Sequence, residues 1–155
     1  MNNEELKNQG LEQLMHRLKW EYILFWALAL VLMVIYELGW MEEGTLAHDG
    51  QKCYLLQTLG VLLALGLIPF SLKMFSLAII RRLPELDAEQ ALKVYRRWSE
   101  VRLAMLMVVT VVNLSVYYVT LSSIGGLCAL LGGLASLFCW PDVQRMKSEL
   151  GWEEK

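Results

Sequence analysis

Four long apolar runs limit what this chain can fold into. They cover about residues 21–40, 54–80, 101–120 and 123–140. A helix needs roughly 20 apolar residues to cross a hydrocarbon layer about 30 Å thick. Each run approaches or exceeds that length, so the sequence predicts four transmembrane helices.

The pattern within the runs indicates helices rather than strands. Residues 21–40 (EYILFWALALVLMVIYELGW) are apolar on every side of a helix, whereas an amphipathic surface helix would show a polar face. The runs also lack the alternation of apolar and polar residues that marks a membrane-spanning β-strand. Because lipid offers no hydrogen bonds to the backbone, a spanning segment must pair its own polar groups, as a helix does. We therefore predict an all-α, polytopic membrane protein with a single domain over residues 1–155.

The distribution of Lys and Arg predicts the orientation in the membrane. Residues 1–21 carry three bases, residues 81–102 carry six and residues 141–155 carry three, whereas residues 41–53 carry one. Bases near the ends of spans are retained in the cytoplasm. We therefore expect a protein of the plasma or inner membrane with both termini in the cytoplasm.

The first span does not have the features of a signal peptide. The segment before it carries several acidic residues, and no small-residue cleavage pattern follows it, so the first span is expected to remain in the mature protein.

Three amphipathic segments extend the predicted spans on the cytoplasmic side. After the N-cap candidate Asp87, residues 88–120 contain no Gly or Pro and predict one helix of about 33 residues, or roughly 50 Å. Shorter apolar stripes lie within residues 11–18 and 143–150, with Pro141 as a candidate first helical residue. These segments either pack on one another as an extension of the bundle or form a docking surface for a partner.

Residues 91–101 carry the side chains that would form such a docking surface. One apolar stripe contains Ala91, Val94, Tyr95, Trp98 and Val101. Tyr95 and Trp98 are candidate anchors for a partner because large aromatic residues dominate binding energy at interfaces. Arg96 and Arg97 are alternatively candidates for contact with anionic lipid.

The fourth run is rich in small residues at helical spacing. Gly125, Ala129 and Gly133 repeat every four residues, and Gly126 and Gly132 belong to two further pairs with Ser122 and Ser136. Small residues at this spacing let two helix backbones approach closely in lipid. We therefore expect this helix to make a tight contact, either with the other helices of its own chain or with a second copy.

Three polar residues fall within or at the edge of the predicted spans. Lys73 lies about 12 Å from the expected end of its helix, and an ionisable residue at that depth is a functional-site hypothesis. Its candidate partner is Glu21, although tilting of the helix would also let Lys73 reach the headgroups. Asn113 is expected to hydrogen-bond between helices.

Catalytic and cofactor-binding motifs are missing from the sequence. His16 and His48 fall on opposite sides of the predicted membrane, the three cysteines form no C-x-x-C pair, and no zinc-protease, nucleophile-elbow or phosphate-loop motif occurs. We therefore expect no catalytic residues, no cofactor, no metal site and no enzymatic activity. Only 19% of the residues are charged and the net charge is −2, so a nucleic acid partner is not expected.

These features favour a small membrane protein that acts as an assembly or accessory subunit. It would bind a second copy of itself, or another membrane or cytoplasmic subunit, through the small-residue face of residues 123–140 and the cytoplasmic face around Tyr95 and Trp98. The alternative is a small channel, transporter or lipid-binding protein in which Lys73 and Asn113 line a cavity. Membrane lipids are expected partners in both cases.

Overall fold

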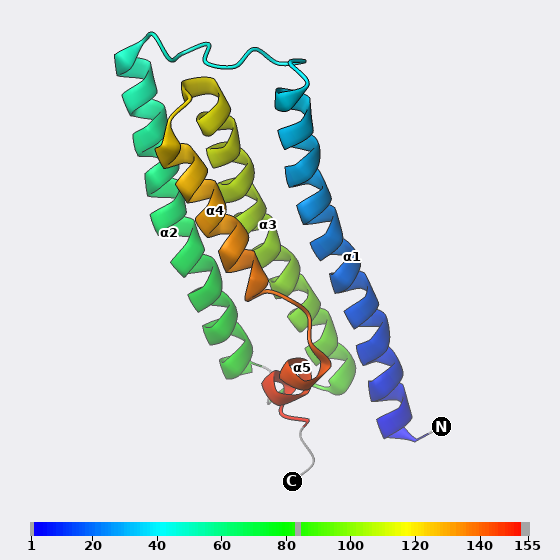
Figure 1. The fold of residues 1–155 in the computed structure, drawn as a ribbon. Coiled ribbons are helices and arrows are strands. Elements are labelled where there is room, and N and C mark those ends of the chain that lie inside the picture. Colours follow the sequence, from blue (N-terminus) through cyan, green and yellow to red (C-terminus); the bar gives the residue numbers. More distant parts are fainter. Residues whose placement is uncertain (1, 83–84, 153–155) are drawn as a thin grey trace.

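The computed structural model describes residues 2–82 and 85–152, and these residues form an all-α structure. The helices in chain order are α1 (Asn3–Glu37), α2 (Gly50–Arg82), α3 (Ala88–Thr120), α4 (Ser123–Leu137) and α5 (Val143–Leu150). Helices α1 to α4 form an elongated bundle, and short α5 lies across the end of the bundle where both chain termini are found (Figure 1). We call this end the terminal end and the opposite one the loop end.

Three of the helices are long and apolar enough to cross a membrane. They are α1 with 35 residues, residues Gly50–Leu77 of α2 with 28, and α3 with 33. These three candidate spans indicate an integral membrane protein. Helix α4 is apolar but has only 15 residues, which corresponds to about 22 Å.

The predicted span over residues 123–140 is therefore shorter in the structure, because α4 ends at Leu137. The chain then leaves the helical path and continues to Asp142 before α5 begins. Pro141 explains this break, since proline has no backbone N–H and disfavours a helical conformation in the residue before it. The Arg145 guanidinium donates a hydrogen bond of 2.7 Å to the Phe138 carbonyl oxygen, which the helix no longer satisfies.

The long helix predicted over residues 88–120 is confirmed, with α3 beginning at Ala88 and ending at Thr120. Leu121 then adopts a left-handed conformation with φ of 52°, which turns the chain sharply. The Ser122 hydroxyl accepts a hydrogen bond of 3.4 Å from the Ile124 backbone N–H and caps α4. This two-residue turn lays α4 back along α3.

Helix α3 occupies the centre of the bundle and contacts α1, α2 and α4. Its buried side chains recur every three or four residues, as expected for one face of a helix. They include Ala91, Tyr95, Ser99, Arg102, Leu106, Val109 and Asn113. The predicted stripe shares Ala91 and Tyr95 with this face but drifts away from it afterwards, so that Val101 is exposed. The face is set by the helices that pack around α3, and it includes the polar side chains of Ser99, Arg102 and Asn113.

The amphipathic segments pack on one another at the terminal end. Their buried side chains form one hydrophobic cluster, which we call the terminal cluster: Leu11, Leu14, Met15, Leu18, Phe75, Ala91, Tyr95, Met146 and Leu150. Four helices contribute to it, and α1 and α3 run without interruption from the cluster into their apolar segments. Helix α5 begins at Val143 with Asp142 as its N-cap, so the prediction of Pro141 as the first helical residue is wrong.

Candidate functional site

The small residues of α4 lie against the helices of the same chain. A Cβ atom added at Gly125 would lie 2.7 Å from the Tyr117 backbone nitrogen, and one at Gly132 would lie 2.7 Å from the Thr110 hydroxyl oxygen. Both residues therefore bring the backbone of α4 close to α3. A Cβ atom added at Gly126 would lie 3.1 Å from the nearest atom of the Tyr117 ring.

The other two predicted packing residues of α4 face α1. A Cβ atom at Gly133 would meet the Trp26 ring at 3.6 Å, and Ala129 packs in a cluster with Tyr36 and Tyr118. The opposite face of α4 carries large exposed side chains, which are Ile124, Leu127, Leu130, Leu131, Leu134 and Leu137. Such a face suits contact with lipid tails or with another apolar helix.

The predicted intramembrane polar residues do not come together. Asn113 is buried between α2 and α3, with its Oδ1 facing Gly60 of α2. Its side-chain amide donates a hydrogen bond of 2.9 Å to the Val109 carbonyl oxygen of its own helix, so the predicted hydrogen bond between helices is not formed within the described residues. Lys73 lies on α2 about 13 residues beyond Gly60, or roughly 20 Å along the helix, and its side chain is exposed. The two residues therefore do not line a common cavity.

The suggested pairing of Lys73 with Glu21 is not formed. Glu21 lies 3.7 Å from the Arg17 guanidinium one turn earlier on α1 and beside the Glu100 carboxyl group of α3. Arg96 forms an ion pair of 2.8 Å with Glu100 on the same side. These four residues make a charged patch between α1 and α3, on the surface near the terminal end.

The four residues predicted to contact a partner or lipid differ in exposure. Tyr95 is buried: its ring packs edge-on against Phe75, with ring centroids 5.5 Å apart. Trp98 and Arg96 are half-buried, and Arg97 is exposed. Of this predicted surface, Arg97, Arg96 and Trp98 are thus accessible from outside the chain.

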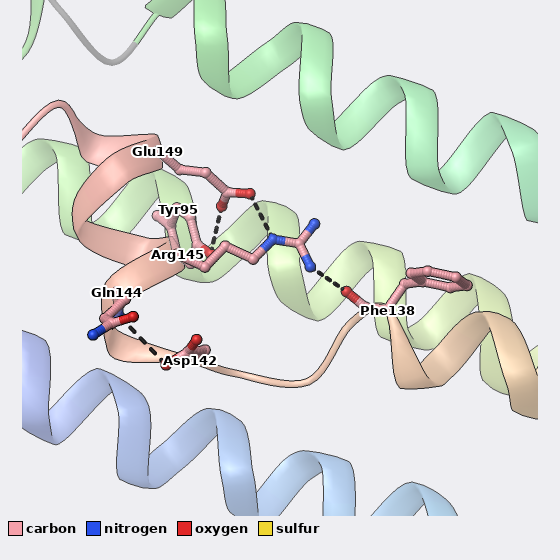
Figure 2. A network of polar contacts seen from close by, with 6 residues as sticks. All are labelled: Tyr95, Phe138, Asp142, Gln144, Arg145 and Glu149. Atoms are coloured by element: carbon pink, nitrogen blue, oxygen red, sulfur yellow. Dashed lines mark hydrogen bonds and ion pairs between the residues drawn. The ribbon is translucent and has the colours of Figure 1, made fainter.

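A network of polar contacts joins α5 to α3 and to the end of α4 (Figure 2). The Tyr95 hydroxyl donates a hydrogen bond of 2.8 Å to the Glu149 carboxylate. The other oxygen of that carboxylate accepts one of 3.1 Å from Arg145 Nε, and Arg145 also binds the Phe138 carbonyl oxygen. The network closes one side of a small cavity that we call the polar pocket.

The polar pocket lies where α1, α3 and the segment between α4 and α5 meet. Its volume is about 20 Å³, which is the space for about one water molecule. Residues that line it include Tyr22, Ser99, Arg102, Trp140, Asp142 and Arg145. Tyr22 and Trp140 pack edge-on with ring centroids 4.9 Å apart and form part of its wall.

Three buried polar side chains of the pocket have an atom without a hydrogen-bond partner among the residues that the structure describes. They are Tyr22, Ser99 and Arg102, which are 5%, 6% and 7% exposed. The atoms concerned are the Tyr22 hydroxyl, the Ser99 hydroxyl and Arg102 Nε. Buried polar groups are normally satisfied, and three unsatisfied ones around one cavity single it out as a candidate binding site.

Arg102 is the most buried of the three charged side chains that line the pocket, the other two being Asp142 and Arg145. The centre of its guanidinium group lies 3.7 Å from the centroid of the Phe75 ring, which gives a cation–π contact on one face. In the part of the chain that the structure describes, every ion pair involves other residues, so Arg102 has no carboxylate within 4.0 Å. A positive charge that is buried without a partner is costly.

Sequence reasoning missed Ser99 and Arg102 as site residues. Arg102 contributed only to the count of bases that set the orientation. A signal was available, because the spacing from Ala91 through Tyr95, Ser99 and Arg102 to Leu106 follows one helical face. That pattern places a serine and an arginine on a buried face.

The described residues contain no group of three or more His, Cys, Asp or Glu side chains placed to hold a metal ion. The polar pocket instead offers hydrogen-bond donors and a positive charge, which suit the binding of an anion. No protein-family model, curated protein or solved structure matches this chain.

Proposed function

We propose that the protein is an assembly or accessory subunit of a plasma or inner membrane, with four membrane-crossing helices and both termini in the cytoplasm. The observation that carries the proposal is the terminal cluster. It makes a folded helical module at one end of the bundle, and α1 and α3 join this module to the apolar segments without a flexible linker. Such a module presents a fixed surface to a partner.

Two features support four crossings although α4 is short. Both termini lie at the same end of the bundle, as an even number of crossings requires (Figure 1). Phe138 and Trp140 continue the exposed apolar surface beyond Leu137. A bilayer adapts to a short span at modest cost by thinning locally.

A transport pathway through one copy receives less support. Leu106 and Val109 at the centre of α3 are completely buried, and Asn113 is packed against Gly60. A channel or transporter would require an open route between the helices at this level. Among the alternatives, lipid binding is the one that a specific feature favours, namely the polar pocket.

The proposed orientation predicts that Cys53 reacts with a membrane-impermeant maleimide on intact cells. Cys53 lies near the start of α2 at the loop end and is half-buried, whereas Cys128 and Cys139 are buried in the bundle. The reagent should label the protein before permeabilisation, and the Cys53→Ser variant should remain unlabelled. Labelling of Cys53 only after permeabilisation would reverse the orientation.

The proposed assembly predicts that purified particles in mild detergent contain more than one chain. The protein mass should be at least twice 17.8 kDa, or should include a co-purifying subunit. Reversing the exposed charge of Arg97 to Glu should lower the associated fraction at least threefold, because like charges at an interface are strongly unfavourable.

The matched control is Lys19→Glu, which reverses an exposed base on α1. It should leave the associated fraction within about 1.5-fold of the original, since it changes the net charge equally without altering the face of α3. A monomeric particle without a bound subunit would contradict the proposed function.

A further inference from the structure

We propose that the polar pocket is a binding site for an oxyanion of the phosphate class, with the headgroup of a phospholipid as its source. The site goes beyond the proposed assembly function and does not depend on it. One oxygen of the phosphate would enter the pocket and the remainder would lie at its opening.

The unsatisfied groups of the pocket define the chemistry of the ligand. Arg102 Nε can only donate a hydrogen bond, and the hydroxyls of Tyr22 and Ser99 are free to donate as well. The three residues come from α1 and α3 and line the same cavity. A single acceptor atom with several lone pairs, such as a phosphate oxygen, can accept hydrogen bonds from more than one donor of the same cavity.

The charges around the pocket favour an anion over water. Arg145 is paired with Glu149 at 3.1 Å, and the Asp142 carboxylate accepts a hydrogen bond from the Gln144 backbone N–H as the cap of α5. The Arg102 guanidinium therefore retains a positive charge that no carboxylate in the described residues pairs with. Water would satisfy the hydrogen bonds of the donors, whereas an anion would in addition pair directly with the Arg102 guanidinium.

The size and position of the pocket indicate a lipid headgroup as the source. A volume of about 20 Å³ accepts one oxygen atom rather than a whole phosphate, so the rest of the ligand must remain outside. Tyr22 and Trp140 stand in the wall, and aromatic residues with one polar edge favour the headgroup level of a bilayer. Phosphates of the lipid leaflet lie at that level.

The experiment measures which lipids the full-length protein retains. Delipidated protein in non-ionic detergent is mixed with phosphatidylglycerol, phosphatidylcholine or diacylglycerol of equal chain length, and bound lipid is counted by native mass spectrometry. Both phospholipids should be retained at least tenfold more than diacylglycerol, which lacks phosphate. Inorganic phosphate is added in a separate arm, and displacement of lipid at micromolar concentration would identify free phosphate as the source of the same oxyanion.

Substitutions test whether Arg102 is responsible. Arg102→Gln should lower phospholipid retention at least tenfold, whereas Lys93→Gln, which removes an exposed charge from the same helix, should change it less than twofold. Equal retention of diacylglycerol, or equal effects of the two substitutions, would overturn the proposal.

A second variant covers the case in which Arg102→Gln does not fold. Tyr22→Phe keeps the ring that packs on Trp140 and removes only one donor. Combined with Ser99→Ala, it should lower phospholipid retention about fivefold relative to the unsubstituted protein. Unchanged retention in the double variant would show that the pocket does not bind the phosphate.

Discussion

Replacing Gly125 with Val is expected to lower the free energy of unfolding by about 3 kcal/mol, the upper part of the range for overpacked positions. A Cβ atom at Gly125 would lie 2.7 Å from the Tyr117 backbone nitrogen and 3.0 Å from the Asn113 carbonyl oxygen. Both are backbone atoms of α3, so neither can rotate away as the end of a side chain does. Helix α4 would have to move away from α3 and lose contact along the rest of its length.

The measurement is thermal unfolding in detergent, where 3 kcal/mol corresponds to a fall in the midpoint of roughly 6–12 °C for a chain of this size. Gly133→Ala on the same helix provides the control, because its Cβ would meet only the Trp26 ring at an ordinary 3.6 Å. We expect its midpoint to stay within about 2 °C, since a small apolar substitution without a clash changes stability little. Similar losses for both variants would show that the close approach at Gly125 is not what holds α4.

The sequence pattern was sufficient to predict helix ends where the residue types change sharply from polar to apolar or where a capping residue occurs. Asp87 marks the start of α3, and the absence of Gly and Pro after it allows the helix to continue to Thr120. The small-residue spacing predicted a close approach of α4 to another helix, and Gly125 and Gly132 lie against α3 of the same chain. The pattern did not reveal where α4 ends, because the apolar composition continues past Leu137 while Pro141 and the hydrogen bond from Arg145 determine the turn.

The candidate site was less predictable because it depends on three segments that are distant in the sequence. Tyr22, Ser99 and Trp140 meet only after α1, α3 and the segment following α4 have packed together. The sequence alone does not show whether a polar residue on a helix will lack a hydrogen-bond partner. That depends on whether neighbouring helices exclude water from it, as they do from Arg102.

Helix α5 also depends on packing, and we expect Met146→Ala to release it from the bundle. The Met146 side chain is 1% exposed and lies in the terminal cluster with residues of α1, α2 and α3. Removing a fully buried methionine side chain costs about 3 kcal/mol. An isolated helix of eight residues is unstable in water, so α5 depends on this packing and on the Tyr95–Glu149 hydrogen bond.

Hydrogen exchange reports the release directly. Backbone amides in the second half of α5 should exchange on the order of 100-fold faster in Met146→Ala, because each 1.4 kcal/mol of lost docking energy raises the open population tenfold. Gln144→Ala alters an exposed side chain on the same helix and should leave exchange within about threefold of the original. If the amides of Met146→Ala stay as protected as those of Gln144→Ala, then α5 is held by its polar contacts with Tyr95 and Phe138 rather than by the terminal cluster. In that case Tyr95→Phe, which removes the hydroxyl bound to Glu149, should expose α5 where Met146→Ala did not.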